Sequence, residues 1–169
     1  MKQMRARAVI MMIIAALFLS GTVFLCGEYV VSGSDWGLYP SNTHLFKNGE
    51  LLRAGKITDR DGTTLVSTED GKRVYNSDES IRKATLHAVG DLSGHIETGL
   101  QSSYLGLLCD FNLLDGAYQH SNLGNDIKTT LSAPVCASAY KALGSRKGTV
   151  GVYNYKTGEL ICMVSTPTY

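Results

Sequence analysis

The sequence has no marked excess of charge of either sign. Among its 169 residues, 16 are Lys or Arg and 15 are Asp or Glu, which gives a formal net charge of +1. Three of the basic residues, Lys2, Arg5 and Arg7, lie within the first eight positions, so the remainder is slightly acidic. Because a nucleic-acid-binding domain needs a basic patch or stripe, no nucleic-acid partner is expected.

Cysteine is also scarce, with four residues in the chain. Cys26 falls within a long apolar run, which leaves Cys109, Cys136 and Cys162 as an odd set. Three cysteines can form at most one disulfide, and widely spaced single cysteines are more often small buried apolar residues. We therefore expect buried thiols, with one disulfide as the less favoured alternative.

The sequence shows no pattern for a metal or a cofactor, and neither is expected. The four histidines lack metal-ligand spacing, so we expect solvated or capping roles for His44, His87, His95 and His120. Gly-Asp-Leu-Ser-Gly at 90–94 is not followed by the Gly-Lys-Ser/Thr of a phosphate loop. Asp59 and Asp61 stand close together, but on a turn we expect them to bond nearby backbone amides, with Arg60 paired to an acid elsewhere.

One long apolar run lies near the N-terminus. Residues 9–27 carry no charge and are rich in Ile, Leu, Met, Ala and Phe, which suits one crossing of a bilayer. The basic tip at 1–8 predicts a cytoplasmic N-terminus, with the rest of the chain outside. Residues 24–29 form a poor signal-peptidase site, so an uncleaved signal anchor is favoured over a cleaved signal peptide.

The segment that follows alternates between loop and regular patterns. Residues 28–47 are rich in Gly, Ser, Asn, Tyr and Asp, which predicts a stalk or partly ordered connection. Residues 56–58 and 63–67 flank Asp-Arg-Asp-Gly, and this predicts a β-hairpin. Residues 80–89 predict a helix with Ser80 at its N-cap and Lys83 exposed.

The next predicted elements are a second and a third helix joined by a loop and a short strand. Residues 99–108 place Leu100, Tyr104, Leu107 and Leu108 on one face at helix spacing. Residues 113–124 are a polar loop, and residues 126–130 predict a short strand. A helix over 132–143 follows, with Ser132 as its N-cap and a proline in the first turn.

The C-terminal segment predicts another hairpin, with strands at 149–153 and 159–165 around the Asn-Tyr-Lys-Thr-Gly turn at 154–158. Residues 160–164, Leu-Ile-Cys-Met-Val, are apolar without alternation. Such a run is usually a strand covered on both faces. Nothing after Tyr169 remains to supply that cover, so we expect the sequence to stop within a larger architecture.

Three separated motifs resemble class B penicillin-binding proteins. Residues 53–66, Arg-Ala-Gly-Lys-Ile-Thr-Asp-Arg-Asp-Gly-Thr-Thr-Leu-Val, are similar to the entry motif of that family's non-catalytic pedestal domain, with one extra residue and Asp61 in place of Asn. Residues 99–108 are similar to a second signature, although Gln101 stands where Glu is usual. Residues 148–169 are similar to the stretch that opens the transpeptidase domain, and the three motifs occur in the family's order.

The resemblance implies an α+β protein with one N-terminal transmembrane helix, an extracytoplasmic pedestal over 48–124 and the first helix and β-hairpin of a transpeptidase domain from 125 to 169. It implies a single-pass protein of the bacterial cell membrane that acts in peptidoglycan synthesis. The parent would be a DD-transpeptidase that cross-links stem peptides by serine acyl transfer and binds penicillin. Its implied partners are cell-wall synthesis proteins, among them a polytopic glycosyltransferase.

Two short motifs imitate the catalytic residues of such an enzyme. Ser80 and Lys83 form a Ser-x-x-Lys, and Lys156 opens a Lys-Thr-Gly. No Ser-x-Asn occurs, Ser80 precedes the stretch that the family's serine follows, and Lys156 lies in a predicted turn. We interpret all three residues as chance matches. The family's catalytic serine, lysine and active-site strand would lie beyond Tyr169, so no catalytic residue is predicted in this chain.

Two other interpretations stay open. An anchored, non-enzymatic extracytoplasmic protein could use its hairpins for partner binding, and its helices would then have to cover residues 160–164. A small hydrolase built on Ser80 and Lys83 is the third interpretation, for which the sequence offers no evident pocket.

Overall fold

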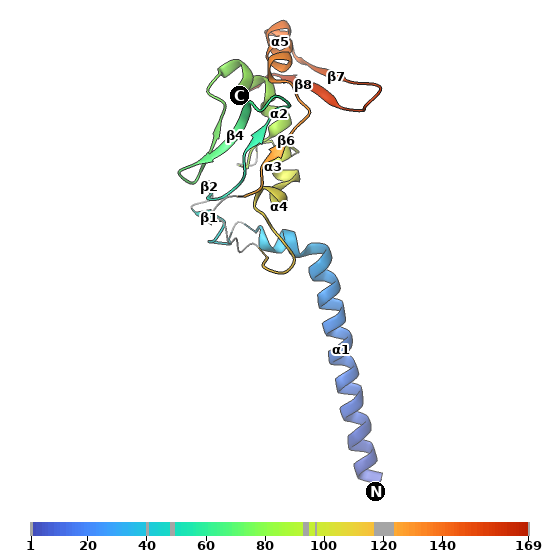
Figure 1. Ribbon diagram of the computed structural model, residues 1–169. Coiled ribbons are helices and arrows are strands. Elements are labelled where there is room, and N and C mark those ends of the chain that lie inside the picture. The colour runs from blue at the N-terminus through green and yellow to red at the C-terminus, as the bar shows by residue number, and fades with distance from the viewer. Residues whose placement is uncertain are drawn as a thin grey trace.

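The computed structural model describes residues 2–39, 41–47, 50–92, 95–96, 98–116 and 124–168. It is an α+β structure in which one long N-terminal helix projects from a domain made of short strands and helices (Figure 1). The predicted fold class is therefore confirmed. His120, most of the predicted loop at 113–124 and the end of the Gly-rich stretch at 90–94 lie outside the described residues.

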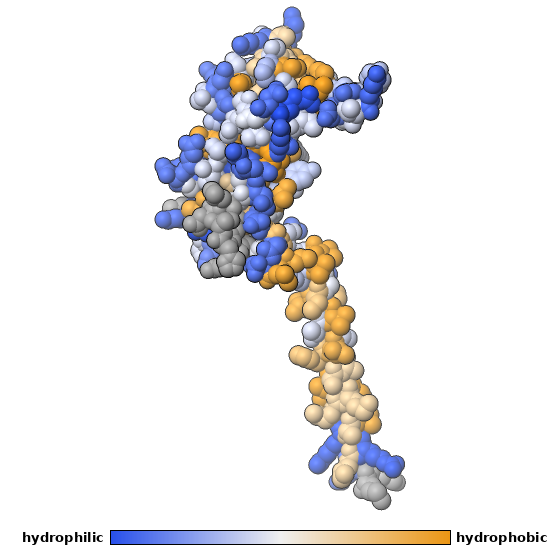
Figure 2. Space-filling model, in the orientation of Figure 1, coloured by the Kyte–Doolittle hydropathy of each residue, from blue (hydrophilic) through white to orange (hydrophobic). Residues whose placement is uncertain are grey.

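The N-terminal helix α1 runs over Lys2–Gly37. It is long and apolar enough to cross a membrane, with a mean hydropathy of 2.6 over its most apolar 18-residue window. Figure 2 shows this helix largely in the colours of apolar residues, with basic side chains at its N-terminal end. The predicted span at 9–27 lies inside α1.

The helix α1 does not end where the sequence predicts a stalk. Residues 28–37 continue the helix, so the first half of the predicted stalk at 28–47 is regular structure. The Tyr29 ring lies over Gly33, where an added Cβ would meet the ring at 3.1 Å. Beyond it, the side chains of Ser34 and Leu38 pack beside Gly106 of the folded domain. These contacts stabilise a segment whose Gly and Ser content alone predicts a loop.

A four-stranded sheet lies at the centre of the folded domain, in the order β5-β4-β3-β6. Its strands are β3 (Ile57–Thr58), β4 (Thr64–Glu69), β5 (Lys72–Tyr75) and β6 (Ile127–Lys128). The pairs β3–β4 and β4–β5 are antiparallel, whereas β6 joins β3 in parallel. The predicted hairpin at 56–67 and the strand within 126–130 are confirmed. A separate two-stranded sheet pairs β1 (Phe46–Lys47) with β2 (Glu50–Leu51).

The helix α2 spans Glu79–Val89, close to its predicted bounds. The predicted N-cap at Ser80 is wrong, because the cap is Asp78, whose Oδ1 accepts hydrogen bonds from the amides of Ser80 and Ile81. Lys83 is not free in solvent either, since its Nζ lies 2.8 Å from Oε1 of Glu79. A carboxylate two residues upstream is the stronger cap because it carries charge at a helix N-terminus.

The predicted helix over 99–108 is broken into α3 (Leu100–Ser103) and α4 (Leu105–Leu108). Tyr104 leaves helical geometry, with φ −117° and ψ 25°. The single predicted apolar face is therefore wrong. Leu108 is buried, but Tyr104 and Leu107 are each 50% exposed, and the polar Gln101 is fully buried instead.

The C-terminal part comprises α5 (Ala133–Leu143), β7 (Gly148–Tyr153) and β8 (Leu160–Thr166). The strands β7 and β8 form an antiparallel hairpin, as the sequence predicts. Burial along β8 alternates, because α2 and α5 cover only the face that carries Cys162 and Val164. The prediction of cover on both faces is therefore wrong for this structure, and Leu160 is exposed.

One hydrophobic core runs through the whole folded domain. Buried residues from β3 and β4 belong to the same cluster as Cys136 of α5 and Val164 of β8. The strand β6 also joins the central sheet. The predicted boundary between 124 and 125 remains a prediction, and in this structure the two sides share both a sheet and a core.

Candidate functional site

The turn between β3 and β4 holds the domain together through one buried carboxylate. Asp59 is fully buried, and its Oδ1 accepts hydrogen bonds from the amides of Asp61 (2.9 Å) and Thr63 (2.8 Å). Its Oδ2 accepts a third bond, 3.0 Å long, from the amide of Ala133 at the start of α5. Asp59 thus caps a helix 74 residues further along the chain. The amide bonds predicted for Asp59 are confirmed, but the link to α5 could not be read from the sequence.

The hydrogen bonds decide the ionisation of Asp59. Burial raises the pKa of its carboxyl, but the hydrogen bonds from the amides of Ala133, Thr63 and Asp61 lower it by more, so the pKa lies below its ordinary value. The carboxylate is consequently charged at neutral pH, and this charge faces the N-terminal end of α5, where the helix dipole favours an anion.

Arg60 extends the same connection to the β7–β8 hairpin. Its Nε donates to the carbonyl oxygen of Thr130 at 3.0 Å, and its Nη2 lies 3.2 Å from Oε2 of Glu159. The predicted ion pair of Arg60 is therefore confirmed, and its acid, Glu159, lies directly before β8. We call Asp59 and Arg60, with their partners Thr130, Ala133 and Glu159, the Asp59–Arg60 joint.

A second polar cluster surrounds Arg73 of β5. The Arg73 Nε donates to Oε1 of Gln101 at 2.9 Å, and its Nη1 donates to the carbonyl oxygen of Gly55 at 2.8 Å. Gln101 Nε2 donates to the carbonyl oxygen of Gly90 at 2.6 Å and to the hydroxyl oxygen of Tyr75 at 3.0 Å. Burial lowers the pKa of Arg73. Within the described residues, its buried Nη2 has no hydrogen-bond partner.

This cluster explains two features of the second sequence motif. Gln101 ties α3 to the sheet, which is why this polar residue is buried. Gly99, directly before α3, lies against Gly90, and an added Cβ would come within 2.2 Å of the Gly90 Cα. Only glycine permits so close an approach of two backbones. The motif therefore has a structural role here.

An apolar groove of about 480 Å³ lies between α3, α4, β6 and β8. Its lining includes Leu100, Tyr104, Leu107, Ile127, Leu160 and Met163. The polar side chains in the lining are mainly hydroxyls, with Lys128 as the basic one. This composition suits the binding of an apolar surface better than acyl transfer, which needs a nucleophile beside a base.

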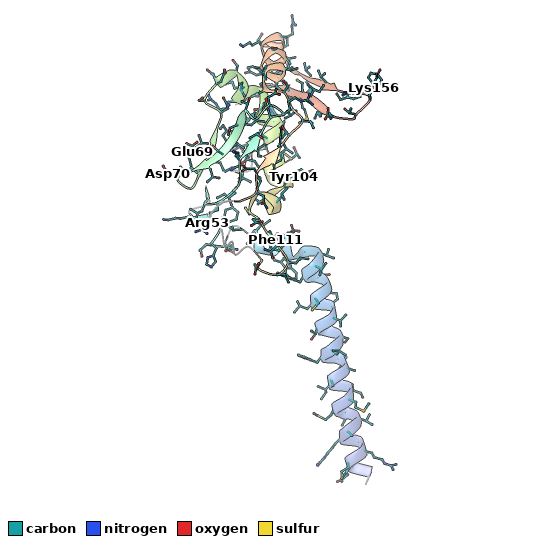
Figure 3. All side chains as sticks on the ribbon, in the orientation of Figure 1. Arg53, Glu69, Asp70, Tyr104, Phe111 and Lys156 are labelled. Carbon is teal, nitrogen blue, oxygen red and sulfur yellow. The ribbon has the colours of Figure 1, made fainter. Side chains whose placement is uncertain are left out.

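The residues that imitate catalytic motifs lie in separate places. Ser80 is in the first turn of α2, and Lys83 pairs with Glu79. Lys156 lies at the tip of the β7–β8 hairpin, 5.7 Å above the Tyr155 ring (Figure 3). In the described ranges no hydrogen bond joins Ser80 to either lysine. That all three are chance matches stays a prediction.

The remaining candidates are structural contacts. Nε2 of His87 lies 3.2 Å from the carbonyl oxygen of Pro167, and Nδ1 of His95 lies 3.1 Å from Oδ2 of Asp91. Over the part of the chain that is described, no three metal-ligating side chains gather. Cys109, Cys136 and Cys162 are all buried thiols, and burial raises the pKa of Cys109 and of Cys162 to about 12.

Comparison with known proteins gives matches among solved structures. The crystal structure of the D,D-transpeptidase domain of a peptidoglycan glycosyltransferase from Eggerthella lenta is 30% identical, with a TM-score of 0.53 over 69% of this chain. Pseudomonas aeruginosa PBP2, solved in complex with WCK 5153, is 23% identical, with the same TM-score over 69% of this chain. No family model and no curated protein sequence matches the chain.

Most of this chain therefore shares its fold with a part of these penicillin-binding transpeptidase structures. The resemblance to class B penicillin-binding proteins, predicted from three ordered motifs, is confirmed. The chain spans 26% of the Eggerthella lenta chain and 28% of the Pseudomonas aeruginosa chain, about a quarter of each.

Proposed function

We propose that residues 1–169 are the membrane anchor and positioning region of a class B penicillin-binding protein. In this proposal α1 is an uncleaved signal anchor that holds the domain on the outer side of the bacterial cell membrane. The intact protein is a DD-transpeptidase that cross-links peptidoglycan stem peptides and is acylated by β-lactams. Residues outside 1–169 supply its catalytic serine and lysine.

One observation carries this proposal. The helix α1 continues without a break to Gly37, and its end packs on α4 beside Gly106, so the apolar helix is mechanically connected to the folded domain. The Asp59–Arg60 joint then connects the central sheet to α5 and the β7–β8 hairpin. A force or an orientation imposed by the membrane on α1 is thereby passed to the segment that resembles the start of a transpeptidase domain.

Membrane extraction and penicillin labelling test the two halves of the proposal. The chain, expressed in bacterial membranes, should stay in the pellet after alkaline washing, because about 20 apolar residues anchor a helix firmly. A fluorescent penicillin should label the host's own penicillin-binding proteins in the same sample but not this chain. Release by alkali would contradict anchoring. A labelled band that disappears in Ser80→Ala would establish Ser80 as a nucleophile.

The apolar groove favours a second candidate function, that of an anchored interaction protein. Tyr104 and Leu107 on its rim are half exposed, and such aromatic and aliphatic side chains often anchor protein interfaces. A cell-wall synthesis protein, such as a polytopic glycosyltransferase, is the partner that the family resemblance suggests. Loss of a co-purifying membrane protein in Leu107→Asp, but not in Lys156→Ala, would support this function.

A further inference from the structure

A loop of the folded domain returns to the membrane helix. After α4, Asp110 adopts a left-handed conformation with φ 54° and turns the chain into a loop closed by the pairing of Asn112 with Gly116. The carbonyl oxygen of Leu113 accepts a hydrogen bond of 3.0 Å from the hydroxyl of Tyr29 in α1. Figure 3 places Phe111 beside the end of α1, where this loop meets the helix. We call residues 110–116 the Leu113–Leu114 loop.

The tip of this loop presents leucines to the surroundings. Leu114 is 95% exposed and Leu113 is 46% exposed, although both are strongly apolar. Trp36 and Tyr39, near the C-terminal end of α1, are also exposed. Single leucines scattered over a surface indicate nothing in particular. An apolar patch beside a membrane helix indicates contact with the bilayer, because the bilayer lies next to it.

The depth of the loop follows from the position of charges along α1. Residues 8–27 are uncharged, and 20 helical residues at 1.5 Å each span about 30 Å, the thickness of the hydrocarbon core. The first charged residue after them is Glu28. Tyr29, which holds the loop, consequently lies at the boundary of the hydrocarbon, where aromatic residues of membrane proteins concentrate.

The charges near the loop favour an apolar rather than an electrostatic contact. Glu28, Asp110 and Asp115 are acidic, and the two aspartates already accept hydrogen bonds from Asn125 and Asn112. Acidic groups do not attract anionic lipid headgroups. Any binding of this loop to a bilayer must therefore come from the burial of Leu113 and Leu114.

We propose that the Leu113–Leu114 loop inserts into the outer interface of the bilayer and gives the folded domain a second membrane contact beside α1. This rests on the proposed function, since α1 must cross the membrane. Two contacts fix the tilt of the domain, which a single helix would leave variable. The packing of Ser34 and Leu38 beside Gly106 holds the same orientation from the protein side.

Depth-dependent tryptophan quenching tests this contact in the full chain. Trp36 is the sole tryptophan, so Trp36→Phe gives a silent background. In that background, Leu114→Trp replaces a fully exposed side chain, and Tyr155→Trp, at a site 79% exposed on the distant hairpin tip, is the matched control. Both variants are reconstituted into phosphatidylcholine liposomes with bromine on shallow acyl carbons.

We expect Leu114→Trp to have blue-shifted emission and to lose roughly half of it to the brominated lipid, because interfacial side chains reach that depth. Tyr155→Trp should emit as in water and stay unquenched. Equal, water-like emission from both variants would overturn the proposal. A blue shift without quenching would also overturn it, because a second protein molecule, and not lipid, would then cover the loop.

Flotation of the same liposomes separates the two proposals. If both variants float but Leu114→Trp is not quenched, anchoring by α1 stands and the loop contact is wrong. If neither variant floats, anchoring by α1 is wrong and the loop contact is overturned with it.

Discussion

The two turns at 59–62 and 154–158 use the same local chemistry with different consequences. Asp59 Oδ1 accepts a hydrogen bond from the amide of Asp61 at 2.9 Å, and Asn154 Oδ1 accepts one from the amide of Lys156 at 3.0 Å. In the first turn Asp59 is buried, and its second carboxylate oxygen accepts a hydrogen bond from the amide of Ala133, although Asp61 and Gly62 are exposed. The second turn is mostly exposed, and the hydrogen bond to its Asn154 side chain is local. Short-range sequence therefore specifies a turn, but long-range partners decide how much the fold depends on it.

Removal of the buried Asp59 carboxylate should have the largest effect. We expect Asp59→Ala to lower the free energy of unfolding by about 3 kcal/mol, because three amides lose a charged acceptor. Asn154→Ala, at the exposed turn, should change it by about 0.5 kcal/mol or less. Urea unfolding of the full chain in detergent measures both. Similar losses in the two variants would mean that the fold depends equally on both turns.

The same carboxylate predicts an acid dependence. Because the pKa of Asp59 is lowered in the folded state, its contribution is present above the unfolded pKa of about 3.9 and is lost as the pH falls further. The stability of the wild type should therefore drop more steeply below pH 4 than that of Asp59→Ala. Parallel acid profiles for the two proteins would show that Asp59 is not ionised as described.

The two strands of the β7–β8 hairpin allow a buried and an exposed valine to be compared within one element. Val164 of β8 is buried under α2 and α5, and Val152 of β7 is 40% exposed. We expect Val164→Ala to cost about 2 kcal/mol through the cavity that it leaves, and Val152→Ala about 0.5 kcal/mol. Both are measured by urea unfolding. A large loss at Val152 would mean that the open face of the hairpin is covered in solution.

Arg60 should have a smaller effect than Asp59, although both belong to one joint. Its ion pair with Glu159 is partly exposed, and such pairs contribute little. We expect Arg60→Ala to lower the free energy of unfolding by about 1 kcal/mol, mainly through its bond to the Thr130 carbonyl. Lys156→Ala, on the exposed turn, should leave the urea midpoint unchanged. If Arg60→Ala lowered the free energy of unfolding as much as Asp59→Ala does, Arg60 would contribute as much as Asp59 to the stability of the joint.

Ionisation of the buried cysteines should have the smallest effect on stability at neutral pH. Cys109 and Cys162 have pKa values raised to about 12 by burial, so an alkylating reagent at pH 8 should react with neither in the folded chain. Tyr155→Cys, on the exposed turn, should react at once. Stability should fall as the pH rises from about 9 towards 12, because only the unfolded thiols ionise there. Rapid native-state alkylation of Cys162 would contradict the cover by α5.

The sequence predicts the local elements of this fold well. Residues 9–27 indicate the membrane helix, and the Asp-Gly and Thr-Gly pairs of the two turns place the hairpins. The strand β5 was missed, although Asp70 and Gly71, both with positive φ, provide the same turn signal. Asp78, two residues before the predicted cap at Ser80, is likewise a residue type that favours the N-cap of a helix.

Contacts between segments that are distant in the sequence could not be predicted from it. The hydrogen bond from the amide of Ala133 to Asp59 spans 74 residues. The close approach of Gly90 and Gly99 leaves no signal in the local sequence pattern. The break at Tyr104 has the same origin, because burial of Gln101 against Arg73 overrides the apolar periodicity of residues 99–108. The hydrogen bond from Tyr29 to Leu113 also joins regions that the sequence places in separate domains.

We propose that α1 anchors the folded domain on the outer side of the membrane. Alkaline phosphatase fused after the last residue of the full chain tests it, since this enzyme is active only outside the cytoplasm. We expect high activity that stays in the alkali-washed membrane pellet, and no activity when residues 9–27 are deleted. An inactive fusion in the membrane, or an active one released into the soluble fraction, would contradict the account.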